Sequence, residues 1–90
     1  MKLNFPVDKA ARLSAALDAF EDAERTGEGE YVVDFYDFEP PLSMELAFAQ
    51  GGVEVLAAQR LSFDEELDGY YLSGPENDAA LIARALETLL

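Results

Sequence analysis

The choice between a largely helical and a largely β-stranded protein depends on residues 43–60, SMELAFAQGGVEVLAAQR. Met44, Leu46 and Phe48 alternate with small or polar residues, which is the pattern of a half-buried strand. Two adjacent glycines follow and suit a tight turn, where positive φ angles are needed. A helix is the alternative, because alanine is frequent here, but each glycine would cost about 1 kcal/mol inside a helix. The pattern therefore favours a β-hairpin that turns at the glycine pair and returns to about residue 60.

Three further segments have the composition of strands. Residues 31–38, YVVDFYDF, are rich in aromatic and β-branched side chains, and Pro40-Pro41 follows them. Residues 2–5 alternate polar and apolar side chains before Pro6, which predicts a short edge strand. Residues 70–73, YYLS, predict a last strand after a turn at Asp68-Gly69.

Two segments have the spacing of amphipathic helices. The first is predicted to run from Asp8, as its N-cap, to about Arg25, with Gly27 as its stop. The second is predicted to begin at Gly74-Pro75, because proline is favoured in the first helical turn. Their apolar positions recur every three or four residues, as one buried helix face requires: Ala10, Leu13, Ala16, Leu17 and Phe20, then Leu81, Ile82, Ala85, Leu86 and Leu89.

The order of these segments predicts the fold class. We expect one α+β domain over residues 1–90, in the order β-α-β-β-β-β-α. Its sheet is a single antiparallel layer of four to five strands, and the two helices cover one face or one end of it.

The charge of the chain is the strongest indication of function. Ninety residues carry 19 Asp and Glu against 6 Lys and Arg, a net charge of −13. A small domain stays soluble with a net charge of about 2 to 8, so the surplus exceeds what solubility needs. It predicts a basic protein partner. Acidic charge disfavours phosphate backbones and anionic lipids, so we expect neither direct nucleic-acid binding nor membrane binding.

The residue types also limit the chemistry. The chain contains no histidine and no cysteine, which removes the usual base near neutral pH, thiolate nucleophiles and cysteine-bound zinc. It has no glycine-rich phosphate loop and no serine in a nucleophile elbow. We therefore expect a non-enzymatic protein without cofactor or metal. The lack of cysteine and of a signal peptide at the amino terminus predicts a cytoplasmic location.

Residues 64–69, DEELDG, partly match a calcium-binding loop. Carboxylates stand at positions 1, 3 and 5 and glycine at position 6, as in an EF-hand. The twelfth position, however, is Pro75, with Glu76 one residue late. The sequence favours a solvent-exposed acidic turn, and calcium binding is the alternative.

Acidic residues cluster at the end of the first predicted helix and in the following loop: Glu21, Asp22, Glu24, Glu28 and Glu30. Carboxylates at the carboxyl end of a helix oppose its dipole, each at a cost of about 0.3–1 kcal/mol. The cluster is therefore either a solvated helix face or a site for a partner.

A second cluster combines Asp34, Asp37 and Glu39 with Tyr36 and Phe38. If Phe35 faces the helices, Asp34, Tyr36 and Phe38 lie on the opposite face of the sheet. Exposed aromatic residues rimmed by carboxylates are typical of interfaces. Alternatively, the loop through Pro40-Pro41 covers Tyr36 and Phe38. Both readings stay open at this point.

Residues 71–77, YLSGPEN, lead from the last strand into the final helix. This segment, with the acidic composition, resembles bacterial immunity-type α+β domains over about a quarter of the chain. The resemblance implies an inhibitor that occupies a basic surface of a partner protein, such as a nuclease or a nucleic-acid-binding protein. A phage-type inhibitor or a DNA mimic of the anti-CRISPR kind fits the same charge.

The main alternative is structural. Val32, Tyr36 and Phe38 would then be buried between two copies in a homodimer that serves as a scaffold or an adaptor.

Overall fold

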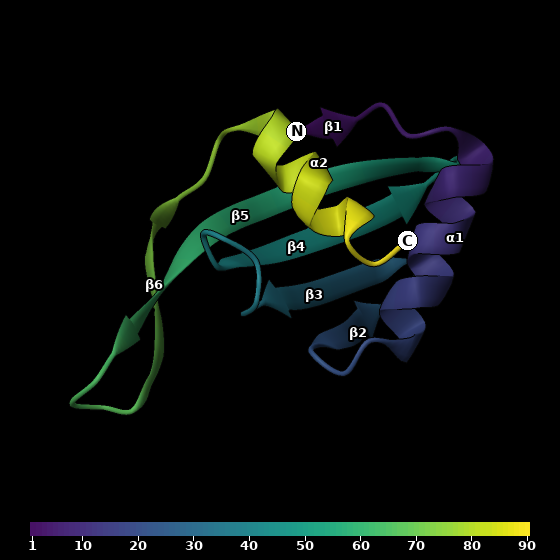
Figure 1. The fold of residues 1–90 in the computed structure, drawn as a ribbon. Helices are drawn as coiled ribbons and strands as arrows, with labels where there is room; N and C mark the ends of the chain where they lie inside the picture. The colour runs from purple at the N-terminus through teal and green to yellow at the C-terminus, as the bar shows by residue number, and fades with distance from the viewer.

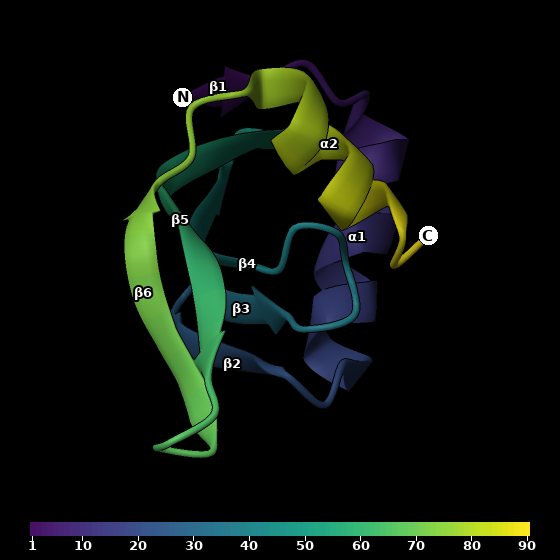
Figure 2. The same cartoon turned by 60° about the vertical axis from the view of Figure 1, so that its left-hand side comes forward.

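A six-stranded antiparallel sheet, with two helices on one of its faces, makes up the computed structural model, which describes residues 1–90 (Figures 1 and 2). In chain order the elements are β1 (Lys2–Leu3), α1 (Val7–Ala19), β2 (Ala23–Gly27), β3 (Glu30–Phe35), β4 (Leu42–Ala49), β5 (Gly52–Asp64), β6 (Gly69–Pro75) and α2 (Ala79–Glu87). The α+β class and the single antiparallel sheet are confirmed. The predicted order holds with one strand more, β2.

The long strand β5 organises the sheet. The strand order is β1-β5-β4-β3-β2, and β6 also pairs with β5. β1 pairs with residues 53–54 of β5, and β6 pairs with residues 59–64. β1 and β6 therefore lie one after the other along the edge of β5 opposite β4. Beyond Arg60, which is opposite Leu42, the first residue of β4, the β5–β6 hairpin continues away from the helices (Figure 1).

The β4–β5 hairpin is confirmed, with its turn one residue earlier than the glycine pair suggests. Ala49 pairs with Gly52, so Gln50 and Gly51 are the two turn residues. Their φ angles are 52° and 74°, as a type I′ turn requires. Gly52 is already the first residue of β5.

The two glycines of this hairpin should respond differently to alanine. A Cβ atom added to Gly51 would lie 2.9 Å from Val7 Cγ2, in a backbone conformation that alanine avoids. We expect Gly51→Ala to lower the free energy of unfolding by about 1–3 kcal/mol. Gly52→Ala is the matched control, since its nearest neighbours would be 3.6 Å away. Urea unfolding of both variants measures the difference, and equal losses would contradict the turn geometry.

One hydrophobic core lies between the inner face of the sheet and both helices. Its sixteen buried residues include Leu13 and Leu17 of α1 and Ile82 and Leu86 of α2. The sheet contributes every second residue of its central strands, as the alternation of a strand dictates: Tyr31, Val33, Phe35, Leu42, Met44, Leu46, Val53 and Val55.

The prediction that the first helix reaches Arg25 is wrong. α1 ends at Ala19, and Phe20 turns into extended backbone, where its ring stacks 6.0 Å from that of Phe35. Residues 23–27 then form the edge strand β2 beside β3, with Gly27 opposite Glu30. The contacts of Phe20 and the pairing of β2 outweigh the helical spacing. At the other end, Pro6 precedes the helix, and Asp8 lies in its first turn instead of capping it.

The second helix begins later than predicted. Pro75 is the last residue of β6 and not the first of the helix. Asp78 is the N-cap, and its carboxylate accepts hydrogen bonds from the N–H groups of Ala80 and Leu81 at 3.0 and 3.3 Å. This cap fixes where α2 starts.

Candidate protein-binding surface

The sheet face opposite the helices, here called the outer face, has no element packed on it in either view (Figures 1 and 2). Because side chains alternate along a strand, this face carries the residues between those of the core. In the sheet register, Val32 lies between Glu24 and Glu45, and Ala47 lies between Glu30 and Glu54. The outer face therefore holds five carboxylates around small or apolar residues: Glu24, Glu30, Asp34, Glu45 and Glu54.

The outer face continues onto the β5–β6 hairpin as an aromatic surface. Phe63 is opposite Tyr70, and Leu61 is opposite Leu72. The Tyr70 ring centroid lies 5.3 Å from that of Phe63 and 4.8 Å from that of Tyr36. Phe63, Tyr70 and Leu72 are 43–55% exposed. We call Tyr36, Phe63, Tyr70 and Leu72 the aromatic arm.

Tyr36 joins the acidic and the aromatic parts. Its hydroxyl donates a hydrogen bond to Asp34 Oδ2 at 3.1 Å. Partial burial raises the pKa of the Tyr36 phenol above its usual value, and the hydrogen bond to Asp34 and the negative charge of that carboxylate raise it further. The phenol therefore stays protonated at neutral pH, and the pair presents a rigid polar edge beside the rings.

A cleft of about 360 Å³ brings together other residues of the predicted site. It lies where the chain leaves α1, passes the end of β3 and meets the end of α2. Its lining includes Glu21, Asp22, Tyr36, Asp37 and Phe38. Glu21 and Asp22 lie just beyond the end of α1 and not within its last turn.

The predicted binding residues thus fall into separate groups. Glu24, Glu30, Asp34 and Tyr36 share the outer face or its continuation, whereas Glu28 and Glu39 are exposed in loops. Of the two arrangements left open by the sequence, the covered one describes Phe38, which is half-buried against the core, and the exposed one describes Tyr36.

Sequence reasoning missed Glu45 and Glu54 on the outer face and Phe63, Tyr70 and Leu72 on the arm. The alternation from Leu61 to Asp64 was the available signal for the arm.

Half of the cations of the chain are engaged in ion pairs. Lys9 pairs with Glu87 at 2.6 Å, Arg25 with Asp18 at 3.8 Å and Arg60 with Glu76 at 2.8 Å. On the outer face the only cation in register is Lys2, opposite Glu54 at the edge of the sheet. The negative charge of this face therefore stays largely uncompensated.

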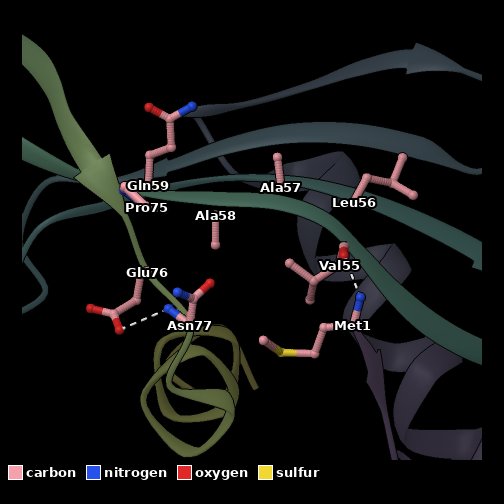
Figure 3. A pocket seen from close by; sticks show the side chains of 9 residues that line it. All are labelled: Met1, Val55, Leu56, Ala57, Ala58, Gln59, Pro75, Glu76 and Asn77. Atoms are coloured by element: carbon pink, nitrogen blue, oxygen red, sulfur yellow. Dashed lines mark hydrogen bonds between the residues drawn. The ribbon is translucent and has the colours of Figure 1, made fainter.

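The largest cavity, about 430 Å³, lies beside β5 where the edge is open between β1 and β6 (Figure 3). Val55, Ala58 and Met1 contribute apolar surface, and the amino-terminal ammonium group donates a hydrogen bond to the carbonyl of Val55 at 3.0 Å. Glu76 lines the same cavity and is 8% exposed.

Both carboxylate oxygens of Glu76 accept hydrogen bonds within the protein. Oε1 accepts from Arg60 Nε at 2.8 Å, and Oε2 accepts from the N–H groups of Asn77 and Asp78 at 3.1 Å each. The Arg60 hydrogen bond is the main cause that lowers the pKa of Glu76 below its usual 4.5, and the Asp78 N–H contributes next. Glu76 therefore joins β5, β6 and the cap of α2.

Replacing Glu76 with glutamine should destabilise the protein at neutral pH. A lowered pKa in the folded state means that the carboxylate stabilises the fold above its pKa in the unfolded chain. This stabilisation disappears as the pH falls through the folded-state pKa. We expect Glu76→Gln to lower the melting temperature at pH 7 and the gap to wild type to close in acid. Calorimetry at pH 7 and in acid measures both melting temperatures. Glu65→Gln on the exposed turn is the control for the lost charge. A difference in melting temperature that does not depend on pH would contradict the role given to the Glu76 carboxylate.

The acidic turn after β5 uses one of its carboxylates locally. Asp64 Oδ1 accepts hydrogen bonds from the N–H groups of Glu66 and Leu67 at 2.9 and 3.3 Å. No group of three or more carboxylates in the chain is arranged to hold a metal ion. The two hydrogen bonds to Asp64 define an Asx-type turn. The remaining carboxylates of the turn, Glu65, Glu66 and Asp68, are exposed.

The chain matches no protein-family model, no curated protein and no solved structure. Its helices, of 13 and 9 residues, are too short to pass through a lipid bilayer.

Proposed function

We propose that this protein is a small non-enzymatic inhibitor that occupies a basic surface of a partner protein, in the manner of immunity-type or phage-type inhibitors. One observation carries the proposal. The outer face carries five carboxylates, four of them on exposed residues, and continues into the aromatic arm, and no element of the chain covers either.

The two parts of this surface have complementary roles. Uncompensated carboxylates attract a basic partner over a distance and accelerate association. Tyr and Phe side chains bury large areas at low entropic cost and supply most of the affinity in many interfaces. Tyr70 and Phe63 are already packed against each other, so little freedom is lost when a partner covers them.

The arrangement of the carboxylates favours a partner that binds phosphates. Neighbouring strands lie about 4.8 Å apart, and alternate residues of a strand lie about 6.8 Å apart. Since Val32 and Ala47 lie between carboxylates of different strands, the outer face presents spaced negative groups, as the phosphates of a nucleic acid are spaced. A nuclease or another nucleic-acid-binding protein is the proposed partner, and the absence of cysteine favours a cytoplasmic complex.

A homodimer through the outer face is less favourable. Its carboxylates would face those of a second copy, and Phe38, which the homodimer would have buried, already packs against the core. Like charges brought together at an interface cost several kcal/mol.

Affinity capture from the lysate of the source organism tests the proposal. The bait is compared with two variants that each raise the net charge of −13 by four units. Glu30→Lys/Glu45→Lys changes the outer face, whereas Asp8→Lys/Ala15→Lys/Ala19→Lys changes the helical side at exposed residues that take part in no ion pair. We expect one basic protein at near-equal stoichiometry on wild type and on the helical-side variant, and much less on the outer-face variant. Equal recovery on both variants, or only a salt-labile mixture of basic proteins, would contradict the proposal.

A further inference from the structure

Three strands, β1, β2 and β6, pair with a neighbour on one side only, and their open edges differ in composition. β1 contributes only two residues, and β2 carries Glu24 and Arg25 and a bulge before Gly27. Charges and bulges of this kind discourage pairing with another chain. β6 is seven residues long, carries no charge and has its one proline at the last position.

The backbone groups on the open edge of β6 follow from the alternation of an antiparallel ladder. Leu61 donates its N–H to the carbonyl of Pro41, on the β4 side of β5. Its partner Leu72 therefore belongs to a pair that exchanges no hydrogen bonds, and so does Tyr70 opposite Phe63. The N–H and C=O groups of Tyr70 and Leu72 point outward, while those of Tyr71 pair with Ser62.

The side chains along this edge are exposed on both faces of the hairpin. Tyr70 and Leu72 are 43% and 55% exposed on one face, and Tyr71 is 50% exposed on the other. An added strand would cover apolar surface on both sides and would hydrogen-bond with the two outward residues. This is the geometry of recognition by β-strand addition, in which backbone bonds give affinity and alternate side chains give specificity.

The charge of the turn next to β6 indicates which kind of strand would pair with its open edge. The turn that joins β5 to β6 carries Asp64, Glu65, Glu66 and Asp68, and no cation lies in it. A strand that pairs with β6 would extend past this turn. Lys or Arg side chains at that end would find carboxylates, whereas β6 of a second copy has no charged residue to offer them.

We propose that the open edge of β6 binds an extended segment of a partner protein that alternates apolar with Lys or Arg residues. The inference rests on the proposed function and adds the form of the partner: a basic strand paired with β6, with its cations near the acidic turn. The outer face then contacts the rest of the partner.

Selection from a display library of random linear peptides tests the edge without knowledge of the partner. We expect enrichment of peptides in which apolar and cationic residues alternate. Bound peptide should slow hydrogen exchange of the Tyr70 and Leu72 amides, which exchange quickly in the free protein. The Tyr71 amide, already paired with Ser62, should change little.

Two variants of Leu72 isolate the backbone contribution. Leu72→Pro removes the outward N–H and is compatible with an edge strand, whereas Leu72→Ala shortens the side chain and keeps the N–H. We expect selected peptides to bind Leu72→Pro at least about tenfold more weakly than Leu72→Ala, since a hydrogen bond is lost and the ring blocks pairing. Protection of the Tyr71 amide in Leu72→Pro shows that the hairpin is intact.

A charge variant keeps the inference testable if Leu72→Pro does not fold. Glu65→Lys/Glu66→Lys brings the charge of the turn from −4 to zero and should remove the preference for cationic peptides. A selection without any enrichment would overturn the inference. So would selected peptides that protect other amides, or that bind these variants and the wild type equally. A concentration-dependent dimer that protects Tyr70 and Leu72 would assign the edge to a second copy instead. A basic partner captured through the outer face, with no peptide bound at β6, would leave the proposed function intact and remove only this inference.

Discussion

Replacing Ile82 with alanine is expected to lower the free energy of unfolding by about 2–5 kcal/mol, the usual cost of this truncation in a core. Ile82 is completely buried between α2 and the sheet. α2 has nine residues, and a helix of this length is not stable without its packing partners. Small domains are stable by only about 5–15 kcal/mol, so this single change removes a large share.

Urea unfolding followed by far-ultraviolet circular dichroism measures this loss. Leu67→Ala is the control, because Leu67 is 77% exposed at the turn of the β5–β6 hairpin; its effect should stay within about 0.5 kcal/mol. Equal effects of the two changes would mean that α2 does not close the core. Folded Ile82→Ala should still bind a partner normally, since Ile82 is on the inner side of the sheet.

The sequence allowed the central hairpin and the strand that follows Glu30 to be predicted, because their patterns are local. The predicted end of that strand at Phe38 was wrong, since β3 ends at Phe35. Met44 and Leu46 alternate with residues of the other face, and the glycines fit only a turn. The start of α2 shows the limit of such rules: proline at position 75 suggested an earlier start, and the structure places the N-cap at Asp78. The end of α1 was not predictable, since only the packing of Phe20 on Phe35 reveals it.

The candidate surface was predicted in part for the same reason. Asp34 could be assigned to the outer face from alternation within one strand, and Tyr36 lies just beyond the end of that strand. Glu45 and Glu54 join them only through the register with neighbouring strands, which a single sequence does not specify. The aromatic arm depends on the pairing of Phe63 with Tyr70 across a turn, and this register is likewise not specified by a single sequence.

The largest expected effect on function is that charge variants and aromatic variants change different rates of complex formation. Charge variants should change the association rate, and aromatic variants should change the dissociation rate. With the partner recovered by capture, Glu30→Lys/Glu45→Lys should slow association by about tenfold or more at low salt, because it removes steering charge. Dissociation should change much less. The loss should shrink as salt is added, since exposed charges are screened beyond about 10 Å at 0.1 M. The folded state should be as stable as wild type or more so, because the variant reduces self-repulsion.

Tyr70→Ala should have the opposite kinetic signature. Tyr70 contacts both Tyr36 and Phe63, so its loss breaks up the aromatic arm while the net charge stays at −13. A central aromatic anchor is worth about 2 kcal/mol or more, which corresponds to dissociation roughly thirtyfold faster with association nearly unchanged. Surface plasmon resonance at two salt concentrations separates the two rates. If both variants altered only association, the aromatic arm would lie outside the interface and charge alone would hold the complex. If neither altered any rate, the partner would bind elsewhere, and the uncovered outer face would have no part in its recognition.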